Sequence, residues 1–146
     1  MKITQLSVFL ENKPGRLSHP CRALADAGIN ILTLSLADTH QFGIMRLIVK
    51  EPQKAKKALE AAGCVVNLTE VIAIEVPDRP GGLADVLMAI EKSALNVEYM
   101  YAFTFRRADK AIIVFRFEDP DAGIRAIQAK GMNVISSVEL YERAGK

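Results

Sequence analysis

The stretch Asn12-Lys13-Pro14-Gly15-Arg16-Leu17 recurs later in the chain as Asp78-Arg79-Pro80-Gly81-Gly82-Leu83. The two copies of the motif are offset by 66 residues, from Pro14 to Pro80. Further matches follow in the same order: Ile29-Asn30-Ile31 with Leu95-Asn96-Val97 at the same offset, then Gly63-Cys64 with Gly131-Met132 at an offset of 68. A colinear series with one two-residue insertion, which we expect in a hairpin loop, indicates that the chain contains the same module twice.

Each copy has the pattern strand, helix, strand, strand, helix, strand. In the first copy, residues 3–10 alternate between apolar and polar side chains, as a half-buried strand does. Residues 29–36 and 42–49 are apolar and rich in β-branched side chains, and Pro52 marks the first turn of a second helix. The pattern predicts an α+β fold of two tandem ferredoxin-like βαββαβ modules, with antiparallel sheets and helices on one face.

No linker separates the copies. Residues 65–76 form an apolar-rich run that contains neither glycine nor proline. Its middle should serve as the last strand of the first copy and the first strand of the second. We therefore expect modules at residues 1–70 and 71–146, with the boundary between Thr69 and Ala73. A module of about 70 residues has a marginal core, so the two copies should share an interface.

The amino-acid composition and net charge disfavour several classes of protein. Half of the 146 residues are hydrophobic, which disfavours disorder, and the net charge of +2 is too small to indicate nucleic-acid binding. Neither a signal peptide nor a membrane span is predicted, so we expect a cytoplasmic protein. Cys21 and Cys64 are read as reduced core thiols. A metal site at His19 and Cys21 lacks a second pair of ligands, and we expect neither metal nor cofactor.

The turn before each first helix has the chemistry to bind an amino acid. The free N–H groups of a first helical turn favour a carboxylate, and glycine lets the backbone approach a bound group. The oxygen of Asn12 or Asp78 can accept a hydrogen bond from an ammonium group. An alternative is that Asn12 and Asp78 only cap the helices, which is their commonest role.

These motifs resemble the ACT family. The resemblance rests on the Asn- or Asp-x-Pro-Gly turn followed by Gly28-Ile29-Asn30-Ile31, with eighteen residues from Asn12 to Asn30 and from Asp78 to Asn96. It implies paired modules that hold an amino acid between the turn of one module and the asparagine of its neighbour. The residues implicated as ligand-binding are Asn12, Gly15, Arg16, Leu17, Asn30, Asp78, Gly81, Gly82, Leu83 and Asn96.

The two predicted half-sites are not equivalent. Pro20 should distort the first turn of its helix, and Ala94 stands where the first copy has the capping Gly28. Asp78 carries a full charge, and Gly82 should let the backbone approach a ligand more closely than Arg16 does. We therefore expect the second copy's turn to bind more tightly. We also expect Asn12 to act with Asn96, and Asp78 with Asn30.

An alternating aromatic stripe runs through Tyr99, Tyr101, Phe103 and Phe105. Ordinary packing explains such a stripe, because strands favour aromatic residues. A sharper interpretation is that the stripe covers the helix-free face of the sheet and forms a protein interface. Pairing of sheet edges into one eight-stranded sheet, between copies or between chains, would also remove exposed edges, so a homodimer is expected.

Together these features predict a non-catalytic sensor that binds a small amino acid and modulates a metabolic enzyme in trans. An enzyme is disfavoured because the sequence shows no catalytic ordering of side chains. An RNA-binding module is disfavoured because residues 40–47 lack the stacking aromatics, although they faintly echo an RNA-recognition strand. The main alternative is an adaptor that mediates protein association without a ligand.

Overall fold

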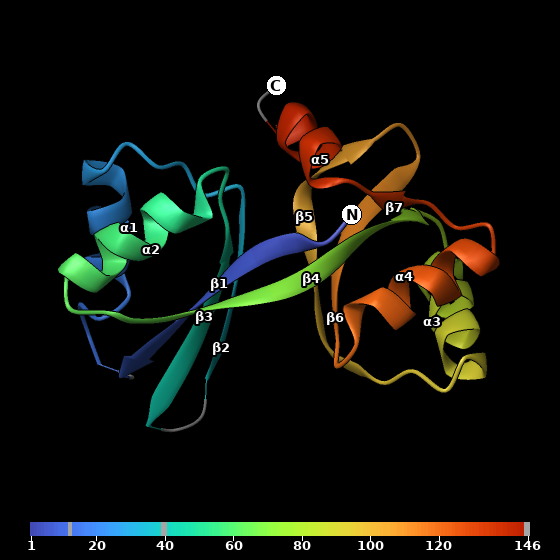
Figure 1. Ribbon diagram of the computed structural model, residues 1–146, viewed down its shortest axis with the longest axis horizontal. Coiled ribbons are helices and arrows are strands. Elements are labelled where there is room, and N and C mark those ends of the chain that lie inside the picture. Colours follow the sequence, from blue (N-terminus) through green and yellow to red (C-terminus); the bar gives the residue numbers. More distant parts are fainter. Residues whose placement is uncertain (12, 39–40, 145–146) are drawn as a thin grey trace. The chain divides into compact units, whose positions relative to one another are not determined.

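The computed structural model describes residues 1–11, 13–38 and 41–144 (Figure 1). The chain divides into two compact units. The first unit is Thr4–Thr69, and the second unit is Glu70–Lys146 together with Met1–Ile3. No helix in the described ranges is long and apolar enough to cross a membrane.

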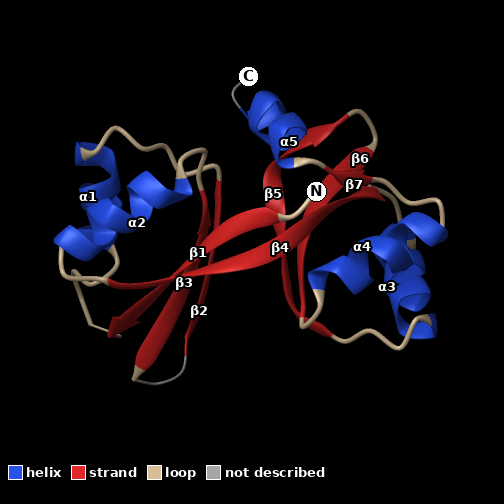
Figure 2. Cartoon of the chain, viewed as in Figure 1, coloured by secondary structure: helices blue, strands red, loops and turns tan. Residues whose placement is uncertain are grey.

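The first unit is built on strands in the order β2-β3-β1-β4. Its elements are β1 (Ile3–Glu11), α1 (Ser18–Asp26), β2 (Thr33–Asp38), β3 (Phe42–Ile48), α2 (Pro52–Ala61) and the beginning of β4 (Val65–Pro77). β3 runs antiparallel to both β1 and β2. Leu6 and Val8 of β1 and Leu47 of β3 are fully buried in its core, together with Leu24 of α1 and Leu59 of α2. Both helices cover one face of the sheet (Figure 2).

The second unit repeats this order as β5-β6-β4-β7. Its further elements are α3 (Gly82–Lys92), β5 (Val97–Arg107), β6 (Lys110–Phe117), α4 (Pro120–Ala129), β7 (Val134–Ile135) and α5 (Ser137–Ala144). Ile72, Ile74 and Phe115 of the sheet pack with Ile90 of α3 and Ile127 of α4. The predicted βαββαβ pattern is thus confirmed in both copies. β4 is one continuous strand that passes through Thr69–Ala73, as expected.

The end of the second copy differs from the prediction. β7 has only two residues, and the chain then forms α5, which the repeat pattern did not predict. The helix begins here because Oγ of Ser136 accepts a hydrogen bond from the N–H of Glu139 at 3.2 Å, which satisfies one donor of the first turn. Leu140 is then fully buried. Figure 2 shows α5 on the opposite side of the strands from α3 and α4.

The two-residue insertion of the second copy is absorbed within a strand, so the prediction of a longer hairpin loop is wrong. Ala102 pairs with Ile113 and Arg106 pairs with Ala111, so β5 advances four residues while β6 advances two. This irregularity lets the strands continue to a short turn at Ala108, whose φ of +53° is left-handed.

The aromatic stripe lies on the face of the sheet away from α3 and α4. Tyr101 of β5 pairs with Val114 of β6, and Val114 pairs with Ala73 of β4. Ala73 lies between Ile72 and Ile74, whose side chains are in the core. Because side chains alternate along a strand, these three paired residues face away from that core. Phe103 is only 7% exposed. The side chain of Phe105 lies outside what the structure describes.

Candidate functional site

The two strand-to-helix turns have the same backbone design. Gly15 and Gly81 adopt left-handed φ values of +84° and +86°, which side chains other than glycine rarely tolerate. The N–H of Arg16 donates to the carbonyl of Lys13 at 3.2 Å, and the N–H of Gly82 donates to Arg79 at 3.0 Å. These two predicted carboxylate donors are therefore engaged within their own turns. Asn12 lies outside the described residues.

Pro20, which was expected to distort a turn, delays the start of the first helix. The N–H of His19 donates to the carbonyl of Gly15 at 3.2 Å, but Pro20 has no N–H to continue the helical ladder. α1 therefore begins at Ser18, whereas α3 begins at Gly82, the counterpart of Arg16. The N–H of Leu17 at the start of α1, and that of Leu83 in the first turn of α3, remain the candidate donors to a carboxylate.

Gly82 has a structural reason to lack a side chain. A Cβ atom at this position would lie 2.0 Å from the carbonyl oxygen of Pro77. Gly82 is buried, and its missing side chain makes room for the backbone of β4. Its expected approach to a ligand, and tighter binding at the second turn, stay predictions.

Ala94 adopts the conformation of the glycine that it replaces. Its φ is +57°, close to the +71° of Gly28 at the end of α1. A left-handed conformation costs a residue with a side chain about 1–2 kcal/mol. The second copy therefore keeps the shape of this turn at the expense of local strain.

A cavity of about 370 Å³ opens at the first turn. Its sheet side is formed by Leu10 of β1, Leu36 of β2 and Gly43 of β3; Leu10 and Gly43 lie opposite each other in the β1–β3 ladder. The turn itself contributes the other wall. The lining residues in the described part of the chain are Leu10, Glu11, Lys13, Pro14, Gly15, Leu17, Leu36 and Gly43.

The described lining of this cavity includes one carboxylate, that of Glu11, and one ammonium group, that of Lys13. Nζ of Lys13 is 3.1 Å from Oε2 of Glu11. The hydrogen bond from Lys13, its charge, and the charge of Arg16 lower the pKa of the Glu11 carboxyl below its ordinary value. An α-amino acid carries an ammonium and a carboxylate, so the pair can face both charges of such a ligand.

Three further predicted residues, Asn30, Asp78 and Asn96, are exposed to solvent. Asn30 and Asn96 lie in the segments that lead into β2 and β5. The backbone N–H of Asp78 donates to the carbonyl of Asp109 at 2.7 Å. The pairing of each turn with the asparagine of the other copy depends on how the units are placed, and it stays a prediction.

Of the ten predicted residues, the cavity includes Gly15 and Leu17. The predicted site residues did not include Leu10, Glu11, Lys13, Pro14, Leu36 and Gly43. Lys13 could have been found, because it is the variable residue of the turn motif. Leu36 and Gly43 come from a hairpin that is distant from the turn in sequence, and only the strand register brings them to it.

The side chains of His19, Cys21 and Cys64 make contacts within the fold of the first unit. Nε2 of His19 donates to the carbonyl of Ala62 at 2.7 Å and so links α1 to the end of α2. Cys21 and Cys64 are free thiols that pack against the first core, and burial raises the pKa of Cys64. Within the described ranges, no group of three or more His, Cys, Asp or Glu residues is arranged to hold a metal ion.

Comparisons with known proteins identify relatives over almost the whole chain. A family described as ACT domain pair matches residues 1–144. The crystal structure of protein BT0572 from Bacteroides thetaiotaomicron has 39% sequence identity and a TM-score of 0.89, over 97% of this chain and 96% of that one. The regulatory subunit of aspartate kinase from Thermus flavus shares the fold at 19% identity and a TM-score of 0.61, over 86% and 90% of the two chains. No curated protein matches in sequence.

Proposed function

The chain belongs to the ACT domain pair family, and on that premise we propose that it is a non-catalytic regulatory protein that binds a small amino acid. The modules at residues 1–70 and 71–146 each present one strand-to-helix turn, and the ligand binds at these turns. The protein then modulates an enzyme of amino-acid metabolism in trans.

The observation that carries this proposal is the cavity at the first turn. It lies where the duplicated motif predicts a binding site, and it combines a turn backbone with one cation and one anion. Its volume falls within the range of small-molecule sites, which is about 300–1,000 Å³. A plain helix cap requires neither a cavity nor a charge pair beside it.

The roles of the groups follow from their charges. The ligand carboxylate meets the N–H of Leu17, at the positive end of the α1 dipole, and the ammonium of Lys13. The ligand ammonium meets Glu11 and the side chain of Asn12. A few charge-assisted hydrogen bonds, less the cost of ordering the ligand, correspond to about 4–8 kcal/mol, or millimolar to micromolar binding.

Action in trans is the part of the proposal that rests on a shared fold. The aspartate kinase subunit that shares this fold is also a regulatory chain. We propose a homodimer as the active form, because β2 and β5 are the end strands in the two strand orders and unpaired edges invite association.

Thermal denaturation of the full chain with each of the twenty amino acids tests the function. A ligand at one hundred times its Kd should stabilise the protein by about 2.7 kcal/mol and raise the Tm. Isothermal titration with that ligand should show about tenfold weaker binding for Lys13→Gln. Lys54→Gln, an exposed lysine of α2, is the matched control and should bind as the unmodified protein does. If no amino acid raises the Tm, the adaptor function replaces the sensor.

A further inference from the structure

The lining of the first-turn cavity is mostly hydrocarbon. Four of its members have apolar side chains: Leu10, Pro14, Leu17 and Leu36. Gly15 and Gly43 present no side chain, and Gly43 sits beside Leu10 in the sheet. Among the lining residues that the structure describes, Glu11 and Lys13 are the charged ones, and they are paired with each other.

Two leucines of this lining are exposed to solvent. Leu17 is 43% exposed and Leu36 is 49% exposed. Covering the apolar surface of a leucine is favourable, because that surface is then removed from water. A ligand that places hydrocarbon between these side chains would gain free energy from this burial.

A polar ligand side chain would find little compensation here. Glu11 and Lys13 face the ammonium and carboxylate that every α-amino acid carries, so they are engaged whichever amino acid binds. A hydroxyl, amide or second charge placed against the leucines would lose water and gain no hydrogen bond from the leucine side chains that it touches, which is unfavourable. The lining thus discriminates by the polarity of the ligand side chain.

We propose that the first turn selects α-amino acids with apolar side chains, aliphatic or aromatic, and that Leu36 is a specificity-determining residue. This inference rests on the proposed function and names its ligand class. It is specific to the first copy, because the counterparts of Leu36 and Gly43 are Ala102 and Ala111. The second turn therefore lacks the leucine that covers the ligand side chain.

The chain supplies a closely matched control. Leu34 and Leu36 lie on the same face of β2, opposite Leu47 and Met45, and they are 48% and 49% exposed. Only Leu36 lines the cavity. A serine at either position removes a similar exposed side chain from the same strand, so a difference between the variants reports on the cavity.

The experiment is isothermal titration of the full chain with leucine, valine, methionine, phenylalanine, serine, aspartate and lysine. We expect binding of the apolar ligands only, weakened about tenfold by Leu36→Ser and changed less than about twofold by Leu34→Ser. Leu36→Ile keeps the hydrocarbon and should retain affinity. Circular dichroism checks that each variant folds, and the ligand panel on the unmodified chain is decisive even if Leu36→Ser does not fold.

The outcomes separate the two proposals. Binding of serine, aspartate or lysine in preference to the apolar ligands overturns the proposed specificity and leaves the sensor function standing. Equal affinity of folded Leu36→Ser and Leu34→Ser overturns the role of Leu36. If none of the twenty amino acids binds, the function and the specificity fall together.

Discussion

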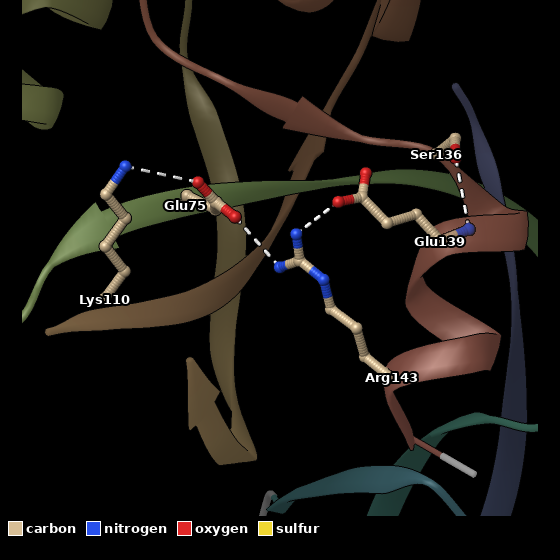
Figure 3. A network of polar contacts seen from close by, with 5 residues as sticks. All are labelled: Glu75, Lys110, Ser136, Glu139 and Arg143. Carbon is tan, nitrogen blue, oxygen red and sulfur yellow. Dashed lines mark hydrogen bonds and ion pairs between the residues drawn. The ribbon is translucent and has the colours of Figure 1, made fainter. Parts of the chain in front are cut away.

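Nη1 of Arg143 lies 2.9 Å from Oε1 of Glu75, and this ion pair joins α5 to β4 (Figure 3). The side chains are only 13% and 9% exposed. Lys110 reaches the other oxygen of Glu75 at 3.4 Å, and Arg143 also pairs with Glu139 within α5. The network fixes the last helix on the face of the second unit's sheet that α3 and α4 leave uncovered.

We expect Arg143→Met to destabilise the chain. The substitution leaves the carboxylate of Glu75 with Lys110 as its remaining cation, and a hydrogen bond to a charged group is worth about 1.5–3 kcal/mol. Urea denaturation should show this loss in the free energy of unfolding. Glu142→Gln, an exposed site on the same helix, is the control and should change it by less than about 0.5 kcal/mol. Equal stability of the two variants would contradict the role given to the network.

The contribution of Glu75 should depend on pH. Burial raises its pKa, but hydrogen bonds from Arg143 and Asn133 and the charges of Arg143 and Lys110 outweigh burial, so the pKa lies below its ordinary value. The folded state therefore favours the carboxylate. This stabilisation is complete above the unfolded-state pKa of about 4.3 and is lost as the pH falls through the lower folded-state pKa.

Urea denaturation of the unmodified chain and of Glu75→Gln between pH 2.5 and pH 7, conditions chosen to span that range, measures the effect. The stability difference between the two proteins should be constant near neutrality and should shrink below about pH 4.3. A difference that stays constant to the acid end of the series would show that Glu75 contributes through packing instead of charge.

Gly82→Ala should destabilise the second unit. The added Cβ would lie 2.0 Å from the backbone oxygen of Pro77, so β4 or α3 must shift. Forcing an atom into a packed region costs about 1–3 kcal/mol. Arg16→Ala at the matched position of the first copy should be nearly neutral. Thermal denaturation of both variants measures the contrast, and an unchanged Tm for Gly82→Ala would refute this account of the glycine.

Ala94→Gly should stabilise the chain, because the residue already has a φ of +57°. Relief of the left-handed conformation is partly offset by the greater entropy of glycine in the unfolded chain, leaving about 0.5–1 kcal/mol. Ala84→Gly, in the exposed part of α3, should instead destabilise by about 1 kcal/mol. Unfolding in urea compares the two, and a loss of stability in both would rule out strain at residue 94.

The two turns should respond differently to loss of their polar residue. We expect Asp78→Ala to lower affinity at the second turn by about 1.5–3 kcal/mol, since Asp78 can form a charged hydrogen bond to the ligand ammonium. Asn12→Ala should cost less, because the amide is neutral. Titration with the ligand found by the amino-acid screen measures both. Unchanged affinity in both variants would leave these turns as helix caps.

The duplication, and the order of the elements as far as β7, can be predicted from local patterns in the sequence. The repeated turn motif, the alternation along β1 and the apolar run through β4 are local patterns, and each reflects a conformational or burial requirement of a few neighbouring residues. Gly15 and Gly81 could be identified for the same reason, since a left-handed φ is a property of one residue. A distorted first turn could likewise be expected from the missing N–H of Pro20.

The residues that surround these turns depend on how distant segments of the chain pack together. Leu36 and Gly43 reach the first turn through the pairing of β1, β2 and β3, and such register joins residues far apart in sequence. The packing requirement at Gly82 was not foreseen, because the atom that crowds it belongs to Pro77, on the other side of the turn. The position of α5 depends on Arg143 finding Glu75, 68 residues away along the chain. Packing between distant segments has no local pattern, and therefore only the folded chain reveals it.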